Sequence, residues 1–325
     1  MTLTPVDRLE VLVIVDNVTD MLSTTPPQVE GEGARLGRRG FAALGAKCLC
    51  CAAHGLSLLI AAYRGDERRM VLFDTGPEEY AFERNATRLG VDLGQVDSVV
   101  LSHGHWDHAG AMLIALGAIR SRNGARATPC YLHPGMFRAR ASRRPNGSVW
   151  PMESIPSVKE LESFGAACVV TTEPQDLYDG MFWVSGEIPR VTSFERGLPG
   201  HLRRTAGGAG WEPDELLTDE RFVAVDVAGK GLVIFSACSH AGIVNALAHA
   251  RASFPRRPIF AVVGGLHLSG ANEAIIPPTV EGLAGFGLKM IAAGHCTGWR
   301  ALTALSRAFG DEIVAPMAVG KTYRF

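Results

Sequence analysis

The fold is decided by one stretch of the chain, VVLSHGHWDHAG at residues 99–110. An apolar, β-branched run stops there, and three histidines and an aspartate follow within six positions. Imidazole nitrogens and carboxylate oxygens are ligands that suit zinc, iron or manganese. Side chains two positions apart at the exit of a strand project the same way, so His103 and His105 can face one point. Asp107 and His108 begin the next turn and can face a second point, so this loop can supply ligands to two metals.

Length and composition exclude several classes of protein. A chain of 325 residues with 47% hydrophobic content can bury a large core. Its 32 Lys and Arg residues balance 33 Asp and Glu residues, so no basic footprint for nucleic acid is expected. The longest apolar runs meet a charge or a glycine before they reach about 18 residues, which argues against a membrane span. The first ten residues carry charge and lack the apolar segment of a secretory signal.

The cysteines indicate a reducing compartment. There are seven, an odd number, and their spacing is irregular. This pattern suits the cytoplasm better than a disulfide framework. A cluster of three cysteines, Cys48, Cys50 and Cys51, resembles half of a metal site, but the sequence has no second cysteine pair that would complete such a site. We interpret the cluster as buried or reactive thiols.

The first hundred residues alternate between strands and one long polar segment. An apolar run at 9–15 predicts a strand, and 20–47 is rich in proline, glycine and charge, which predicts a long loop. Loops of that length are usually functional or mobile. Two further strands are predicted at 58–63 and 70–73, and the second ends in Asp74.

The middle third is less regular. Residues 138–151 are basic and carry prolines, and we interpret them as a solvated loop, with an anion-binding edge as the alternative. A helix at 158–164 and a strand at 168–171 are predicted next. Residues 195–215 again have the composition of a loop.

The last third repeats one pattern: an apolar strand, small residues, a histidine, then a helix or loop. The strands lie at 232–236, 259–263 and 290–293, and they lead to His240, His267 and His295. Strand ends that all carry histidine can converge on one edge of a sheet. His133, His201 and His249 do not follow this pattern, and we interpret them as structural or surface residues.

The motifs together resemble a known family. His103–His108 resembles the His-x-His-x-Asp-His signature of the metallo-β-lactamase superfamily, and Asp74-Thr75-Gly76 and Gly294-His295 resemble its aspartate turn and its late histidine. One branch, the dihydropterin–aminobenzene ribofuranosyl phosphate synthase-like group, is resembled by four further stretches: HGLS at 54–57, SACSHAGIVN at 236–245, GGLHL at 264–268 and GHCTG at 294–298. The resemblance spans roughly residues 9–325.

The resemblance implies an α+β fold, a four-layer αββα sandwich with metals at one edge between the sheets. It implies one domain over residues 1–325, with a loop insertion at about 20–47 and a variable substrate wall at about 135–215. The metal ligands that it implies by position are His103, His105, Asp107, His108, His240 and His295. Among them His103, His105 and His295 would share one metal, Asp107 and His108 would hold the other, and His240 would be a further ligand.

The chain departs from the superfamily pattern at one position. The pattern places an aspartate that bridges both metals after a late strand, whereas the corresponding strand here ends in Ala237-Cys238-Ser239-His240. The centre can therefore be asymmetric, bridged by water alone, or filled by one ion. Asp74 is interpreted as a carboxylate that orients a histidine. Substrate-contacting or supporting roles are open for His54, Glu195, Cys238 and His267, with a ligand role also open for His54 and His267.

The resemblance and the ligand types predict a divalent transition metal, one or two ions, with zinc first and iron or manganese as alternatives. Such an ion lowers the pKa of a bound water and polarises a substrate oxygen, and Asp107 would orient or deprotonate that water. The expected function is hydrolysis of an ester, lactone or phosphoester bond of a small molecule, phosphorylated or pterin-like. The alternatives are a pterin-forming synthase and a non-catalytic, metal-stabilised binding protein. The sequence leaves the oligomeric state open.

Overall fold

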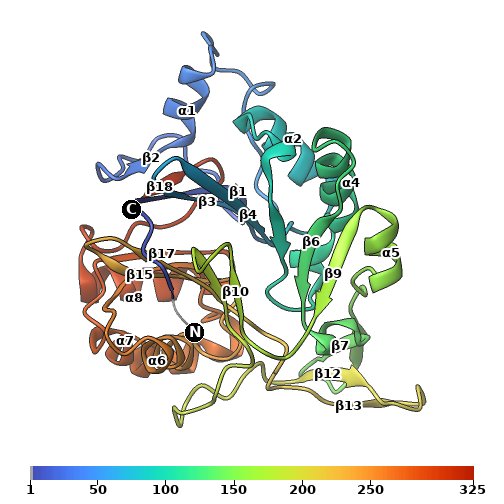
Figure 1. Cartoon of the computed structure of the whole chain (residues 1–325). Helices are drawn as coiled ribbons and strands as arrows, with labels where there is room; N and C mark the ends of the chain where they lie inside the picture. Colours follow the sequence, from blue (N-terminus) through green and yellow to red (C-terminus); the bar gives the residue numbers. More distant parts are fainter. Residues whose placement is uncertain (1–2) are drawn as a thin grey trace.

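Two β-sheets packed face to face form the centre of the computed structural model, which describes residues 3–325 (Figure 1). The first sheet has eight strands in the order β2-β18-β1-β3-β4-β5-β6-β9. Their bounds are β1 (Arg8–Val15), β2 (Val29–Glu30), β3 (Ser57–Arg64), β4 (Glu67–Phe73), β5 (Ser98–Val100), β6 (Thr128–Leu132), β9 (Ala166–Val170) and β18 (Thr322–Arg324). Strand β5, which leads into the histidine-rich loop, pairs in parallel with both β4 and β6.

The second sheet has six strands in the order β10-β11-β14-β15-β16-β17. They are β10 (Gln175–Leu177), β11 (Phe182–Val184), β14 (Val223–Val227), β15 (Gly231–Ser236), β16 (Ile259–Gly265) and β17 (Met290–Gly294). Strands β15, β16 and β17 are parallel neighbours. Their carboxyl ends therefore meet at one edge, which brings the three histidine-bearing turns of the last third together.

Helices cover the outer face of each sheet. The first sheet carries α2 (Glu79–Leu89), α4 (Met112–Arg122) and α5 (Val158–Ser163), and the second carries α6 (Ile243–Ser253), α7 (Ile276–Ala284) and α8 (Trp299–Phe309). The buried apolar side chains divide into three clusters, one between the sheets and one beneath each helical layer. Three cores separate four layers, so the predicted αββα sandwich is confirmed. Among the described residues no helix is long and apolar enough to cross a bilayer.

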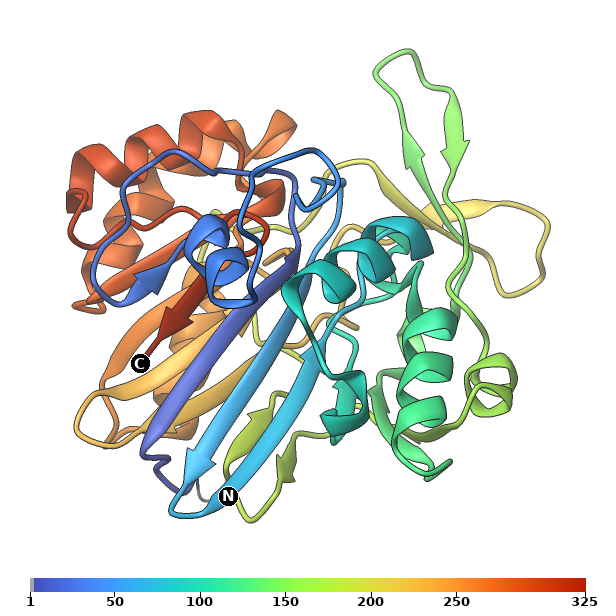
Figure 2. The same cartoon turned by 90° about the horizontal axis from the view of Figure 1, so that it is seen from above.

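The segment from 135 to 215 contains a third, smaller sheet in the order β13-β12-β7-β8. Its strands are β7 (Arg140–Arg143), β8 (Val149–Pro151), β12 (His201–Arg204) and β13 (Trp211–Pro213), and they form two hairpins that extend from the body (Figure 2). The loops predicted at 138–151 and 195–215 are therefore wrong. These strands are polar and short, so they lack the apolar alternation that predicts a strand. The Arg144 guanidinium instead stacks over the Trp150 ring, with its Cζ 3.5 Å from the ring centroid.

The segment from 20 to 47 is also not wholly a loop, because it contains β2 and α1 (Glu32–Arg38). Helix α1 buries only one apolar side chain, Leu36, together with Glu32. It therefore lacks the apolar residues at helical spacing from which a helix is predicted. The Glu32 carboxylate accepts a hydrogen bond from the Cys50 backbone N–H at 2.8 Å. This contact attaches the segment to the cysteine cluster, and all seven cysteines of the chain are free thiols.

Short helical turns complete the architecture. They are η1 (Leu93–Gln95), α3 (Trp106–Ala109), η2 (Pro134–Phe137), η3 (Gly270–Ile275) and η4 (His295–Thr297). Two of them carry candidate ligands, since α3 contains Asp107 and His108 and η4 begins at His295. Helix α3 follows the parallel strand β5 after a short loop and η4 follows the parallel strand β17 directly, which places both at the same edge of the sandwich.

Candidate metal centre

The histidine loop after β5 is held in place by contacts at Gly104 with two other segments of the chain. A Cβ atom at Gly104 would lie 2.3 Å from the Met136 carbonyl oxygen, so this position accepts no side chain. The Gly104 N–H donates to Asp219 Oδ2 at 2.9 Å. The same oxygen accepts from Arg140 Nη2 at 2.6 Å, and both side chains are almost fully buried. A buried ion pair between β7 and the 219–221 segment therefore fixes the position of the loop.

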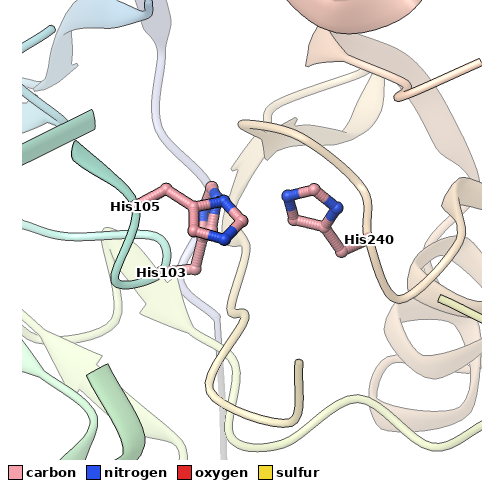
Figure 3. Close-up of side chains that lie close together, drawn as sticks. All are labelled: His103, His105 and His240. Carbon is pink, nitrogen blue, oxygen red and sulfur yellow. The ribbon is translucent and has the colours of Figure 1, made fainter. Parts of the chain in front are cut away.

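The first ligand group joins the two sheets. His103 and His105 lie on one side of the edge, and His240, from the turn after β15, faces them (Figure 3). His103 Nε2 and His105 Nδ1 are 2.9 Å apart, and the His240 ring centroid lies 4.8 Å and 5.0 Å from theirs. Within residues 3–325 neither ring nitrogen of His240 has a hydrogen-bond partner. A buried polar atom without a partner is costly, and a cation would satisfy it.

The second ligand group is Asp107, His108 and His295. Asp107 Oδ2 lies 3.6 Å from His108 Nε2 and 3.4 Å from His295 Nε2. The structure thus groups the ligands differently from the division implied by the resemblance. His295 accompanies Asp107 and His108, and His240 takes its place beside His103 and His105. The reason is the strand order, because β16 lies between β15 and β17 and separates the turns that follow them.

The Cys238 thiol lies between the two groups. Its Sγ is 3.1 Å from His108 Nε2 and 3.4 Å from the sulfur of Cys296. Cys238 also takes part in three further sets of three ligand atoms, one with His103 and His108, one with His240 and His267, and one with His295 and Cys296. The thiol is therefore within reach of side chains from both groups.

The tautomers of His103 and His108 follow from Asp74. This carboxylate accepts hydrogen bonds from the Ser102 N–H, the Ser102 hydroxyl and His108 Nδ1, each at 2.7 Å. Since the Ser102 hydroxyl gives its proton to Asp74, its oxygen accepts from His103 Nδ1 at 2.9 Å. In the neutral form that binds a metal, each of these imidazoles would present an Nε2 lone pair to the centre, and Asp74 orients both rings as a supporting carboxylate does.

The tautomer of His105 depends on His201, which sequence reasoning set aside. His201 lies on β12, is fully buried, and places its Nε2 2.9 Å from His105 Nε2. Its Nδ1 lies 3.0 Å from the Asp214 carbonyl oxygen, which can only accept, so Nδ1 carries the proton. His201 Nε2 thus accepts from His105, and His105 Nδ1 is left as an acceptor facing His103 Nε2. No local pattern marked His201, because the contact crosses between two sheets.

Burial controls the charge of the centre. Together with neighbouring imidazoles and Arg140, it lowers the pKa values of His103 and His105 well below their ordinary range. Burial opposes the charge of His108, but Asp107 and Asp74 raise its pKa to about 9. Burial likewise opposes ionisation of Asp107, but His108 and His295 hold its pKa below the usual value. The first group is therefore neutral and the second contains an ion pair when no metal is bound.

The backbone is strained where these side chains converge. Among the described residues, eight other than glycine have positive φ, and four of those eight surround the centre. The four are Asp74 (59°), Ser239 (60°), His267 (38°) and His295 (49°). A left-handed backbone in such residues persists where the surrounding structure enforces it, and such strain concentrates at functional sites.

The remaining predicted residues divide into two kinds. His54 and His267 belong to the centre: His54 Nε2 lies 3.6 Å from Asp107 Oδ2, and the His267 ring lies 4.4 Å from that of His240. Glu195 does not line the centre, because its carboxylate accepts from the Val244 and Asn245 N–H groups at the start of α6. It is a helix cap, and the expectation of a substrate contact there is not supported.

Glu220 has a supporting role that the sequence did not indicate. It accepts from the backbone N–H groups of His240, at 2.8 Å, and Ala241. Burial raises the pKa of Glu220 to about 7, against the lowering effect of these two bonds. The turn that carries His240 is therefore held by a buried carboxylate. Two arginines of the basic segment 138–151 already have partners within the protein, since Arg140 pairs with Asp219 and Arg144 stacks on Trp150.

Comparisons with known proteins agree with this geometry. The model of the metallo-beta-lactamase superfamily matches residues 54–183. A 7,8-dihydropterin-6-methyl-4-(beta-D-ribofuranosyl)-aminobenzene-5'-phosphate synthase from Methanocaldococcus jannaschii is 29% identical over 84% of this chain and 90% of its own length. The crystal structure of Tm1679, a metal-dependent hydrolase of the beta-lactamase superfamily, superposes with a TM-score of 0.69 at 21% identity, covering 98% of each chain. A diphosphatase of the PhnP family superposes with a TM-score of 0.50 at 13% identity, covering 98% of this chain and 97% of its own.

Proposed function

We propose that this chain, whose residues 54–183 match the model of the metallo-beta-lactamase superfamily, is a metal-dependent hydrolase acting on an ester, lactone or phosphoester bond of a small molecule. One observation carries the proposal. Two sets of three ligand atoms, from His103, His105 and His240 and from Asp107, His108 and His295, lie side by side, each set within 4.8 Å. This arrangement offers a cation three protein ligand atoms at each of two neighbouring points.

The residues fit a metal on their own chemistry. His103 Nε2 and His105 Nδ1 are both hydrogen-bond acceptors, yet they face each other at 2.9 Å. Two lone pairs at that distance repel unless a cation lies beside both, and zinc–imidazole bonds of about 2.0–2.1 Å span such an edge. His240 would complete this set. Asp107, His108 and His295 would hold a second ion, and the Cys238 thiolate would be shared by both.

Side chains at the centre would have separate roles in the reaction. A bound divalent cation supplies a Lewis acid that acidifies water and polarises a substrate oxygen. Asp107 would orient or deprotonate the attacking water, and its ionised carboxylate beside His108 and His295 can accept a hydrogen bond from that water. Asp74, Ser102 and His201 would hold the ligand imidazoles in the required tautomers, so little reorganisation accompanies the reaction.

The test combines metal analysis with substitution. We expect the purified protein to hold one or two equivalents of zinc, iron or manganese, with anomalous scattering centred near His103. His105→Ala and Asp107→Ala should abolish turnover of an ester and phosphoester panel while the fold is retained. His249→Gln is the matched control, because His249 packs against Trp183 and Phe222, away from the centre. Less than one ion per chain, or full activity in Asp107→Ala, would refute the proposal.

A second candidate is supported by a relative. The methanogen synthase aligns with most of this chain and most of its own length, so its reaction is the specific alternative. We propose testing it by product formation from a dihydropterin diphosphate and an aminobenzene ribofuranosyl phosphate. Condensation without hydrolysis of the panel would select the synthase. Tight ligand binding with no turnover in either assay would select a metal-stabilised binding protein.

The wider assignments rest on simpler observations. We propose a single domain over residues 1–325 in which the small sheet at 140–213 forms a wall of the substrate site. We also propose a cytoplasmic location, supported by seven free cysteines.

A further inference from the structure

Asn17 reaches two histidines of the centre from the end of β1. Its Nδ2 lies 3.1 Å from His54 Nδ1, and its Oδ1 lies 3.1 Å from His295 Nδ1. The same amide oxygen accepts from the Gly55 N–H at 3.1 Å, and the same amide nitrogen donates to the His295 carbonyl oxygen at 3.2 Å. One side chain thus makes four hydrogen bonds, and none of the steps proposed above uses it.

The orientation of the Asn17 amide is fixed by two backbone groups. A backbone N–H can only donate, so the Gly55 N–H requires the amide oxygen. A backbone carbonyl can only accept, so the His295 carbonyl requires the amide NH₂. These two requirements are independent and agree, which removes the ambiguity between oxygen and nitrogen that an isolated asparagine has.

The fixed amide dictates opposite tautomers for its two imidazole partners. His295 Nδ1 faces the amide oxygen, so it carries the proton, and Nε2 is an acceptor turned toward Asp107. His54 Nδ1 faces the amide NH₂, so it is the acceptor, and the proton of the neutral ring is on Nε2. His54 Nε2 lies 3.6 Å from Asp107 Oδ2, beyond hydrogen-bond distance, and the His54 side chain is 61% exposed. Its N–H therefore remains available at the open side of the centre.

We propose that Asn17 is a positioning residue that gives His295 a lone pair for metal and His54 an N–H donor for an oxygen of the substrate. The inference rests on the proposed metal centre and adds a substrate requirement, a carbonyl, carboxylate or phosphoryl oxygen within reach of His54 Nε2. One neighbouring contact acts in the same direction. Asp16 Oδ1 accepts from the His295 N–H at 2.8 Å, so the Asp16-Asn17 pair holds the whole turn after β17.

The geometry that supports Asn17 is rigid. A Cβ atom at Gly55 would lie 2.3 Å from the Asp107 carbonyl oxygen and 2.6 Å from Pro77, so the Gly55 backbone is packed tightly against the ligand loop. The Leu56 N–H donates to that Asp107 carbonyl at 3.3 Å. The donor that fixes the Asn17 amide is thereby tied to the same loop that carries Asp107.

The decisive variant is Asn17→Asp, which exchanges the amide NH₂ for an oxygen in the same shape. It keeps the acceptor for the Gly55 N–H and for His295 Nδ1, and it removes the donor to His54 Nδ1 and to the His295 carbonyl oxygen. In metal-free protein labelled with ¹⁵N-histidine, we expect the His54 proton to move from Nε2 to Nδ1 while His295 keeps its proton on Nδ1. The His54→Gln variant assigns the His54 signals, and Asn146→Asp, at an exposed turn where Asn146 only accepts, is the matched control.

Metal binding provides the second readout. Asn17→Ala removes the acceptor of His295 Nδ1, and we expect zinc affinity to fall about 10–100-fold, the usual effect of losing such a partner. Asn17→Asp keeps that acceptor and loses only the bond to the His295 carbonyl oxygen, so its loss of zinc affinity should be clearly smaller. A wild-type His54 proton on Nδ1, or an equal loss of zinc affinity in both Asn17 variants, would overturn the inference. A wild-type protein that binds no zinc would refute the proposed function, and the histidine spectra would still decide the role of Asn17.

Discussion

The buried ion pair between Arg140 and Asp219 predicts a large effect of Asp219→Ala. Both side chains are about 3–4% exposed, and their contact is 2.6 Å. Removing one partner of a buried pair costs about 3–5 kcal/mol, because the other charge stays buried and uncompensated. The substitution also leaves the buried Gly104 N–H without its acceptor, which adds about 1–3 kcal/mol. We expect a loss of roughly 5 kcal/mol in the free energy of unfolding, out of the roughly 5–15 kcal/mol that a domain has.

Urea denaturation followed by circular dichroism measures this loss, and two further variants separate its causes. Asp219→Asn keeps an acceptor for Gly104 but loses the charge, so it should lose less than Asp219→Ala. Arg140→Met combined with Asp219→Asn removes both charges and should recover most of the stability, since an apolar side chain replaces the unpaired guanidinium. A loss below about 1 kcal/mol in Asp219→Ala would show that the pair does not hold the histidine loop.

Three further outcomes follow from individual contacts. His201→Ala removes the acceptor of His105 Nε2, and we expect zinc affinity to fall about 10–100-fold, measured by competition with a chelator; unchanged affinity would contradict the assigned tautomer. Cys238→Ser should remove the thiolate-to-metal absorption of the cobalt-substituted protein while His103 and its neighbours still bind cobalt; a protein that never shows this band excludes Cys238 as a ligand. Glu195→Ala removes the cap of α6 and should cost about 0.5–2 kcal/mol in urea denaturation, with no change in metal content; lost metal would instead place Glu195 in the centre.

The sequence by itself determined the fold and the ligand loop. Strand exit, ligand types and spacing are local properties, and they identified His103, His105, Asp107 and His108 as neighbours. The repeated pattern of strand, small residues and histidine also placed His240 and His295 at strand ends, which parallel pairing of β15, β16 and β17 brings to one edge. The sequence did not predict the strands β7, β8, β12 and β13, because these polar hairpins lack the alternation of apolar and polar residues that indicates a strand.

Only the tertiary structure decided how the candidate ligands divide and which residues hold them in place. His240 joins His103 and His105, and His295 joins Asp107, because the strand order sets which turn lies opposite which loop. The supporting groups come from distant parts of the chain. His201 contacts a residue 96 positions away, and Asn17 contacts one 278 positions away. Local sequence fixes periodicity and turn chemistry, whereas contacts over such separations depend on how the two sheets pack, which no short motif encodes.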